Sequence, residues 1–393
     1  MKTATVTWTS YNNYGTLLQA YALQQKIEQL GHNNEILWDA KILRAFSLQR
    51  KKAPSKAKSV DVSTHPHFSI LSRAGHLLTS PGKAKRVFLS RTDREKYQRP
   101  YYASQEAFDR FRQESLKINT DVELGNLESL NERYDAFIAG SDQIWSVFES
   151  VFNPYYYLSF AKKRKIAYAP CLGTDRIPEE LITRLRALLS DYHALSARED
   201  VSAKQLSELT GRPVAWVADP TLLLTSEQWS ETVRSISLPV KKPYLLCYFL
   251  ENRPWYFEQA GFLAKKLKLR SILIPNKWEY LSSEFVIDGA IGPKEFVALF
   301  QNADYVLTDS YHGSIFSMIF EKDFQYLQRF EENDPNSQNI RIHSLFQYCD
   351  LGNITVTPEK HFFLPPDTDK AALREKLGTL RIRSISYLEN SLR

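Results

Sequence analysis

The sequence predicts an α/β fold built from two parallel-sheet domains with a cleft between them. Short apolar runs of strand type alternate with segments of helical periodicity along most of the chain, which is the pattern of parallel sheets covered by helices. The length of 393 residues suits two domains. The alternation loosens at 219–240, around Pro220 and Pro239. We therefore expect a first domain at 1–225 and a second at 226–393 that ends in a helix.

The first predicted domain opens with a strand, a polar turn at 11–15 and a helix with one apolar face. Leu17, Leu18 and Tyr21 begin that face, and Gly31 is a suitable stop. Further apolar runs have the length of strands. The expected strands are 5–9, 35–38, 135–140, 165–169, 194–197 and 214–217, and a further helix is expected at 106–115.

The second predicted domain repeats the alternation from Tyr244 onward. Its apolar runs are short and are bounded by proline or polar residues, as the strands of a buried sheet are. Segments of helical periodicity separate them. The expected strands are 244–249, 271–275 and 305–307, and the expected helices are 255–267, 293–302 and the segment from Gly313.

Bulk composition indicates an ordinary soluble protein. Hydrophobic residues make up 43% of the chain, enough for two cores, and charged residues 24%. No apolar run approaches the roughly 18 residues of a membrane span, and the chain enters its first strand without a secretory leader. Cys171, Cys247 and Cys349 are far apart, which fits neither a disulfide framework nor a zinc knuckle. We expect a reducing, cytoplasmic location.

Positive charge is concentrated in one insertion. Residues 41–100 hold 15 Lys and Arg against three acidic residues, a local charge of +12, while the rest of the chain carries 36 basic and 42 acidic residues, or −6. Such a segment can dock on the anionic inner face of a membrane. The alternative is a solvated, partly disordered insertion, as the composition of 53–59 indicates. No nucleic-acid-binding signature accompanies it, so we expect no nucleic-acid partner.

The most informative stretch runs from Ala303 to Phe320. A buried strand ends in a polar turn that opens a helix, and α/β sheets bind ligands at such carboxyl ends of strands. The free N–H groups of a new helix attract an anion, and a histidine titrates near neutral pH. The alternative is a helix N-cap by Ser310 or Ser314 beside a hydrogen-bonded histidine. The candidate residues of this turn are Asp309, Ser310, His312, Gly313 and Ser314.

Polar residues also follow several other predicted strands. Tyr14 and Gly15 lie in the turn after the first strand, and Asp142 and Gln143 follow the run at 135–140. For Asp142 the competing interpretation is a helix N-cap. These residues stand at strand ends in the first domain, so they would share one edge of its sheet.

Three further features have a structural interpretation. Arg198 follows another strand. Its interpretation without a functional role is a surface ion pair with Glu199 or Asp200. The Asp219-Pro220 pair indicates a structural turn that leaves the first domain. The His65-Pro66-His67 segment offers two metal ligands, which make a weak site, so we expect no metal.

Taken in order, these motifs resemble those of the polysaccharide pyruvyl transferase family. The resemblance covers nearly the whole chain except the basic insertion and the C-terminal tail. It implies two Rossmann-like domains that face each other across a cleft, as in GT-B glycosyltransferases. The motifs that carry it are 11–15, 140–145, 196–200, 218–220, 309–313 and 336–341.

The resemblance implies a reaction and its substrates. The expected activity moves the pyruvyl group of phosphoenolpyruvate onto a sugar diol as a cyclic ketal and releases phosphate. The acceptor would belong to a bacterial-type cell-surface polysaccharide or its lipid-linked precursor. No cofactor is expected beyond the donor substrate.

The resemblance also assigns donor residues. Arg198 matches the arginine of a Ser-x-Arg-Glu segment, and His312 matches the histidine of an Arg-x-His motif whose arginine is Ser310 here. Arg341, Lys277 and Arg329 are therefore candidates for the missing cation, and Arg341 is favoured by its Ser-x-x-x-Arg context. The turn residues Ser310, Gly313 and Ser314 complete the expected donor site.

Acid–base and acceptor residues follow in the same way. His312 is expected to exchange protons, with Asp309 or Asp142 as the carboxylate that assists it. The acceptor is expected at the first-domain strand ends, on Tyr14, Asp142 and Gln143. Two other functions stay open at this point. One is a GT-B glycosyltransferase that uses a nucleotide sugar, and the other is a non-catalytic polysaccharide-assembly protein on the same fold.

Overall fold

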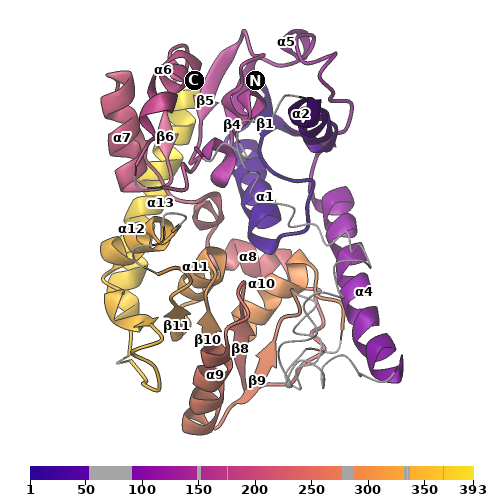
Figure 1. The fold of residues 1–393 in the computed structure, drawn as a ribbon, viewed down its shortest axis with the longest axis vertical. Coiled ribbons are helices and arrows are strands. Elements are labelled where there is room, and N and C mark those ends of the chain that lie inside the picture. The colour runs from indigo at the N-terminus through magenta and orange to yellow at the C-terminus, as the bar shows by residue number, and fades with distance from the viewer. Residues whose placement is uncertain are drawn as a thin grey trace.

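The structure is a computed structural model. Two separate parallel sheets, each covered by helices, form the upper and lower halves of the molecule in Figure 1. The predicted α/β class with two Rossmann-like domains in a GT-B-like arrangement is therefore confirmed. Most of the basic insertion lies outside the described residues, as does Lys277. The structure describes residues 1–52, 91–147, 152–174, 176–276, 287, 289–331, 334, 337–365 and 367–393.

Five parallel strands form the sheet of the first domain, in the order β3-β2-β1-β4-β5. Strand β1 pairs with β2 on one side and β4 on the other, so the chain order reverses between β1 and β4. Such a switch point is where α/β sheets bind ligands. A bridge between Ile166 and Ala194 leads on to the pair β6 and β7. The strands are β1 Lys2–Val6, β2 Asn33–Leu37, β3 Ile118–Asn119, β4 Ala136–Ala139, β5 Arg164–Ala167, β6 Ser196–Ala197 and β7 Ala215–Trp216.

The second sheet has the same construction, in the order β12-β11-β10-β8-β9. Strand β8 pairs with β9 on one side and β10 on the other, so a second switch point lies between β8 and β10. All its pairs are parallel. The strands are β8 Tyr244–Tyr248, β9 Arg270–Leu273, β10 Tyr305–Thr308, β11 Phe324–Leu327 and β12 Thr355–Val356.

Helices flank both sheets. In the described part of the chain, none is both long and apolar enough to cross a bilayer. The α-helices are α1 Tyr14–Gln29, α2 Ala40–Lys52, α4 Arg91–Ser115, α5 Leu130–Arg133, α6 Glu179–Leu189, α7 Asp200–Thr210, α8 Ser226–Thr232, α9 Pro254–Leu267, α10 Pro293–Asn302, α11 Tyr311–Ile319, α12 Ile340–Cys349 and α13 Lys370–Leu392. The 3-10 turns are η2 Gln143–Trp145, η3 Pro154–Tyr157, η4 Pro220–Leu223 and η6 Gly352–Ile354.

The predicted elements agree closely with the observed ones, with two differences. Helix α4 begins well before 106–115, because the sequence pattern marked only the part whose Phe108 and Phe111 are buried. Strand β1 ends at Val6, before the predicted end at residue 9. Beyond it the Thr7 hydroxyl donates to the carbonyl of Ser141 at 2.9 Å, so the chain leaves the ladder there.

A continuous hydrophobic core joins the two domains. Tyr14 of α1 stacks on Phe296 of α10, with ring centroids 4.6 Å apart and planes at 13°. Its hydroxyl donates to the carbonyl of Ile291 at 2.9 Å. The same cluster contains Leu17 from the first domain and Phe316 from the second. Apolar contact therefore fixes the start of α1 against the second domain.

The last helix, α13, runs from the second domain back to the first, as the yellow ribbon in Figure 1 shows. The backbone N–H of Ala218 donates to Ser384 Oγ at 2.8 Å, and the Tyr387 hydroxyl donates to the carbonyl of Ala167 at 2.8 Å. The sequence predicts this helix as the end of the second domain. Its C-terminal half packs on the first, so it links the two.

Candidate active site

The predicted strand–turn–helix is present where β10 ends and α11 begins at Tyr311. Ser310 is the N-cap, and its hydroxyl accepts from the Gly313 N–H at 3.2 Å. Ser314 donates its hydroxyl to the Ser310 carbonyl at 3.1 Å. A Cβ on Gly313 would lie 2.5 Å from Thr308 Oγ1, so the glycine lets the helix approach the strand. The capping role of Ser310 is confirmed, and donor binding by these three residues stays a prediction.

Asp309 ties the end of β10 to the loop after β8. Its Oδ1 accepts from the Leu250 N–H at 2.6 Å and its Oδ2 from the Glu251 N–H at 2.9 Å. Burial raises the pKa of Asp309 to about 6, although the two backbone hydrogen bonds act in the other direction. Both carboxylate oxygens are thus engaged by backbone. The geometry gives Asp309 a structural task and does not support its predicted catalytic role.

His312 faces a carboxylate of the first domain instead. Its Nε2 lies 3.4 Å from Asp219 Oδ2, an ion-pair distance without the alignment of a hydrogen bond. The same oxygen accepts from Arg198 Nη1 at 2.9 Å. Burial alone would raise the pKa of Asp219, but His312 and Arg198 hold it well below its usual range. Asp219 is therefore ionised at neutral pH.

Asp219 and Arg198 belong to a buried network. The alternative prediction for Arg198 was an ion pair at the surface. Asp219 Oδ1 accepts from the backbone N–H of Thr221 at 3.0 Å and from its hydroxyl at 2.7 Å. Arg198 Nε donates to Glu199 at 3.1 Å, and its guanidinium lies 4.6 Å from the centre of the Tyr311 ring. Arg198 Nη2 is buried and has no hydrogen-bond partner among the described residues. One arm of this guanidinium is thus left without a partner in the described part of the chain, although it is fully buried.

Gly15, near the start of α1, makes room for the imidazole. A Cβ on Gly15 would lie 2.0 Å from His312 Nδ1 and 2.3 Å from its Cγ. Any side chain there would displace the ring. Asn13 caps α1 by accepting from the Thr16 N–H at 3.1 Å, which sets the course of this backbone.

Arg341 stands at the start of α12. Its Nη2 donates to Gln338 Oε1 at 2.6 Å, and with the Gln143 amide oxygen turned toward it, its Nη1 donates to Gln143 at 3.0 Å. The guanidinium carbon of Arg341 lies 5.9 Å from the centre of the Tyr311 ring, which Arg198 also contacts. Burial, with Arg198 close by, lowers the pKa of Arg341. No carboxylate pairs with it in the described ranges, so its charge is met there only by the neutral amides of Gln143 and Gln338.

Asp142 has an unusual backbone at the switch point of the first sheet. Its φ of 74° and ψ of −173° belong to a region that residues with side chains rarely adopt and that gathers at ligand sites. Its Oδ1 accepts from the Gln143 N–H at 2.9 Å, so the alternative N-cap interpretation is confirmed. Its Oδ2 accepts from the Thr16 hydroxyl at 2.6 Å. An acceptor role for Asp142 and Gln143 stays a prediction.

One predicted site residue, Tyr14, does not offer its polar atom to this place. Tyr14 is only 3% exposed, and its hydroxyl donates its hydrogen bond to the carbonyl of Ile291. The geometry therefore makes Tyr14 a contact between domains and does not support its acceptor role. Lys277 lies outside the described residues. Arg329 is paired with Glu251 at 3.3 Å, which leaves Arg341 as the better cation.

The structural turn predicted at Asp219-Pro220 is confirmed, since Asp219 caps η4, but the sequence did not predict its contacts with Arg198 and His312 or the contact between Gly15 and His312. Asp219 follows β7, so the rule that polar residues at strand ends meet at one edge applied to it as well. The proline after it favoured a purely structural turn. Gly15 lies in the motif that already named Tyr14, but only the position of His312 shows why a glycine is required.

The arrangement can bind an anion and exchange protons. It combines an imidazole, two guanidinium groups and the start of a helix. Within the described ranges, no group of three or more His, Cys, Asp or Glu side chains could hold a metal ion. The expectation of catalysis without metal or cofactor stays a prediction.

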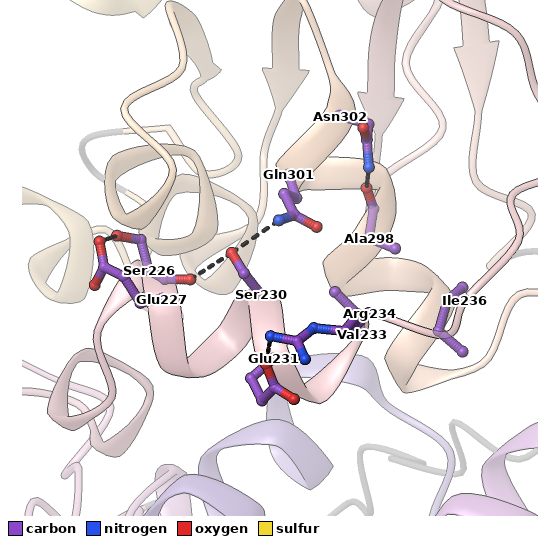
Figure 2. A pocket seen from close by; sticks show the side chains of 10 residues that line it. All are labelled: Ser226, Glu227, Ser230, Glu231, Val233, Arg234, Ile236, Ala298, Gln301 and Asn302. Carbon is purple, nitrogen blue, oxygen red and sulfur yellow. Dashed lines mark hydrogen bonds and ion pairs between the residues drawn. The ribbon is translucent and has the colours of Figure 1, made fainter.

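A separate pocket lies between α8 and α10 (Figure 2). It has a volume of about 540 Å³ and a mostly polar wall, in which Gln301 donates to Ser230 at 2.8 Å. None of the candidate site residues lines it. Its walls are Ser226, Glu227, Ser230, Glu231, Val233, Arg234, Ile236, Ala298, Gln301 and Asn302.

Solved structures with a similar chain course include sugar-nucleotide enzymes. A putative UDP-N-acetylglucosamine 2-epimerase from Listeria monocytogenes is 10% identical with a TM-score of 0.49, covering 99% of this chain and 90% of that one. The UDP-GlcNAc 2-epimerase of Methanocaldococcus jannaschii, in complex with UDP-GlcNAc and UDP, is 13% identical with a TM-score of 0.48, covering 97% and 92%. The E. coli heptosyltransferase WaaC is 12% identical with a TM-score of 0.40, covering 96% and 99%. Similarity this weak carries no argument about function.

Comparison at the level of sequence is more specific. A search among curated proteins found no significant match. The family model described as polysaccharide pyruvyl transferase matches residues 13–324, which hold the start of α1, both arginine and histidine motifs and β10 with α11. The match covers well over half of the chain, and the chain therefore belongs to the polysaccharide pyruvyl transferase family.

Proposed function

We propose that this transferase moves the pyruvyl group of phosphoenolpyruvate onto a sugar diol and releases phosphate. The observation that carries the proposal is the group of His312, Asp219, Arg198 and Arg341, which joins the two domains in a member of this family. It pairs an imidazole, the kind of group that serves in acid–base catalysis, with cations suited to a donor that has a phosphate and a carboxylate.

The chemistry needs one proton delivered to carbon. Protonation of the methylene carbon of phosphoenolpyruvate makes its C2 electrophilic. One sugar hydroxyl adds to C2, the bond from C2 to the phosphate oxygen breaks, and the second hydroxyl closes the cyclic ketal. Of the two hydroxyl protons, one ends on the new methyl group and the other on the phosphate, so atoms balance. A histidine that accepts and returns protons supplies this catalysis.

The donor site combines three features. Arg341 has no carboxylate partner in the described ranges, and its planar fork fits a carboxylate or phosphate with two parallel hydrogen bonds. Arg198 offers its unpaired Nη2. The N–H groups in the first turn of α11 are suited to binding an anion. Arg341 thus takes the place of the arginine that the family motif has where this chain has Ser310.

The acceptor side is the first domain. Asp142 and Gln143 stand at the switch point between β1 and β4, and Gln143 reaches across to Arg341. The acceptor is a sugar of a cell-surface polysaccharide or of its lipid-linked precursor, presented at the cytoplasmic face of the membrane. Residues 41–100 would hold the enzyme there through their charge of +12.

The proposal is tested by phosphate release from phosphoenolpyruvate in a screen of oligosaccharide acceptors, with mass detection of the product. The expected product gains the mass of pyruvate less water. Phosphate release with no ketal product would instead indicate hydrolysis. Turnover with a nucleotide sugar but not with phosphoenolpyruvate would favour the glycosyltransferase alternative, and no turnover of either would favour the assembly protein.

Membrane attachment is tested separately by co-sedimentation. Vesicles with anionic lipid should carry the protein down at low salt and release it at high salt, since screening shortens to about 8 Å at physiological ionic strength. Neutral vesicles are the control. Recovery in the supernatant under every condition would indicate an enzyme for soluble acceptors.

A further inference from the structure

We infer that Asp219 is a positioning residue that keeps the proton of His312 on Nε2, so that Nδ1 is the nitrogen that exchanges protons with the substrates. The inference rests on the proposed function and adds the roles of the individual ring atoms. Asp219 lies before η4 on the first domain, and His312 lies in α11 of the second. The pair therefore exists only while the two domains are joined.

The tautomer follows from the partner of Nε2. A neutral imidazole carries a proton on one nitrogen and accepts on the other, whereas an ionised carboxylate only accepts. His312 Nε2 lies 3.4 Å from Asp219 Oδ2. Asp219 accepts hydrogen bonds from Arg198 and from the N–H and hydroxyl of Thr221, so it faces His312 as an acceptor, and Nε2 is then the nitrogen that carries the proton in that contact. Nδ1 is then left as the acceptor.

Hydrogen bonds to both oxygens fix the orientation of the Asp219 carboxylate. Its Oδ1 is held by the N–H and hydroxyl of Thr221, at 3.0 and 2.7 Å. Its Oδ2 is held by Arg198 at 2.9 Å, and Arg198 is itself bound to Glu199 at 3.1 Å. Arg198, Glu199 and Asp219 together carry one net negative charge. The imidazolium that forms during turnover neutralises it.

The other neighbours of the ring leave that balance in place. Within α11, the Tyr311 ring lies 5.3 Å from the imidazole, and Arg341 of α12 stands on the same tyrosine at 5.9 Å. From α1 the neighbour is Gly15, which has no charge. Arg341 is the cation kept for the donor. The only carboxylate in contact with the His312 side chain among the described residues is therefore Asp219.

Access to the ring agrees with this assignment. The side chain of His312 is 10% exposed, but its Nε2 is buried. The exposed surface therefore lies on other atoms of the side chain, and Nδ1 lies on the side of the ring that packs against Gly15. A Cβ on Gly15 would lie 2.0 Å from Nδ1 and cover it. The glycine thus leaves the space that the ring needs beside Nδ1.

Nitrogen NMR of the full-length protein labelled with ¹⁵N-histidine reads the tautomer without any substrate. The ring signals of His312 are assigned by their loss in His312→Gln. At a pH where the ring is neutral, the wild type should show the Nε2–H form. Asp219→Asn should shift the ring toward the Nδ1–H form and lower kcat at least tenfold, with the KM for phosphoenolpyruvate within twofold of wild type.

Thr221→Val is the matched control, because it removes one hydrogen bond to Asp219 and leaves the charge. It should keep the Nε2–H form. An Nδ1–H form in the wild type overturns the inference, and that measurement decides even if Asp219→Asn fails to fold. An unchanged tautomer in folded Asp219→Asn overturns it too. If phosphoenolpyruvate is not a substrate, the proposed function fails while the tautomer still reports on the pair.

Discussion

At the scale of single residues, the proposal assigns donor binding to Arg341, a cation without a carboxylate partner in the described ranges. Arg341→Lys keeps the charge but loses the planar fork. We expect the KM for phosphoenolpyruvate to rise roughly tenfold, the effect of about 1.4 kcal/mol of lost binding. The control is Arg374→Lys, at an exposed arginine that pairs with Glu321 at 2.6 Å. A KM that does not move in Arg341→Lys would assign the donor to another cation.

In the proposed mechanism, turnover depends on His312. His312→Gln retains a polar side chain of similar reach but removes the group that exchanges protons. Loss of acid–base catalysis should lower kcat by roughly 10²–10⁴-fold. Steady-state kinetics at saturating phosphoenolpyruvate measures this. A folded His312→Gln protein with near-normal kcat would remove the residue from the mechanism.

Asp39 gives a prediction about pH and stability. It is fully buried after β2, and its Oδ2 accepts from the Tyr156 hydroxyl at 2.8 Å. Burial raises the pKa of Asp39 to about 6, above the roughly 3.9 of the unfolded chain. The protein therefore keeps its full free energy of unfolding below about pH 4, where Asp39 is protonated in both states. Part of that free energy is lost as pH rises through about 6, because the buried carboxyl must then ionise.

Asp39→Asn removes this titration. Relative to wild type, the variant should gain up to roughly 3 kcal/mol of stability between pH 4 and pH 7, as an upper bound from the shifted pKa. Urea denaturation at several pH values measures the difference. The exposed Asp121→Asn is the control, with a difference that stays constant. The same flat result for Asp39→Asn would contradict the buried-carboxylate account.

At the scale of elements, the start of α1 positions α11. Gly15→Ala would place a Cβ 2.0 Å from the His312 ring, so the ring or the helix must move. We expect kcat to fall at least 100-fold, because misplacement by about 1 Å costs that much. Gly261→Ala in α9 is the matched control, since its Cβ would meet open space. Equal activity of the two variants would show that the ring is not held against Gly15.

Sequence patterns predicted elements better than contacts between them. The helix expected at 293–302 matches α10, and the turn before α11 was found because strand, cap and helix are local signals. Asp219 was assigned to a turn, since its partners Arg198 and His312 are remote in sequence and come together only in the folded chain. Periodicity carries no information about such pairs.

At the scale of the whole molecule, the apolar seam between the domains assembles the site. Tyr14→Phe removes the hydrogen bond from α1 to the Ile291 carbonyl and keeps the ring stack on Phe296. Loss of one buried hydrogen bond should cost about 1 kcal/mol of unfolding free energy. The KM for the acceptor should stay within twofold. A large rise in that KM with unchanged stability would restore the acceptor role first predicted for Tyr14.

Domain arrangement was predictable for a different reason than the site. Alternating strands and helices in two series indicate two parallel sheets. The strand order, and with it the switch points, comes from the structure alone. Which face of α1 meets the other domain was not predictable, because an aromatic residue at a strand end suits a ligand site and a core equally well. Tyr14 is buried in the core between the domains, and the neighbouring Gly15 lies against His312.

The central claim is that phosphoenolpyruvate binds between Arg198, His312 and Arg341 where the two domains meet. A crystal structure of the protein with phosphoenolpyruvate tests this most directly. The account predicts the donor at the start of α11, with one anionic group on the Arg341 fork and another near Arg198 Nη2. Phosphoenolpyruvate bound elsewhere, or a nucleotide sugar that occupies this place while phosphoenolpyruvate does not bind, would contradict it.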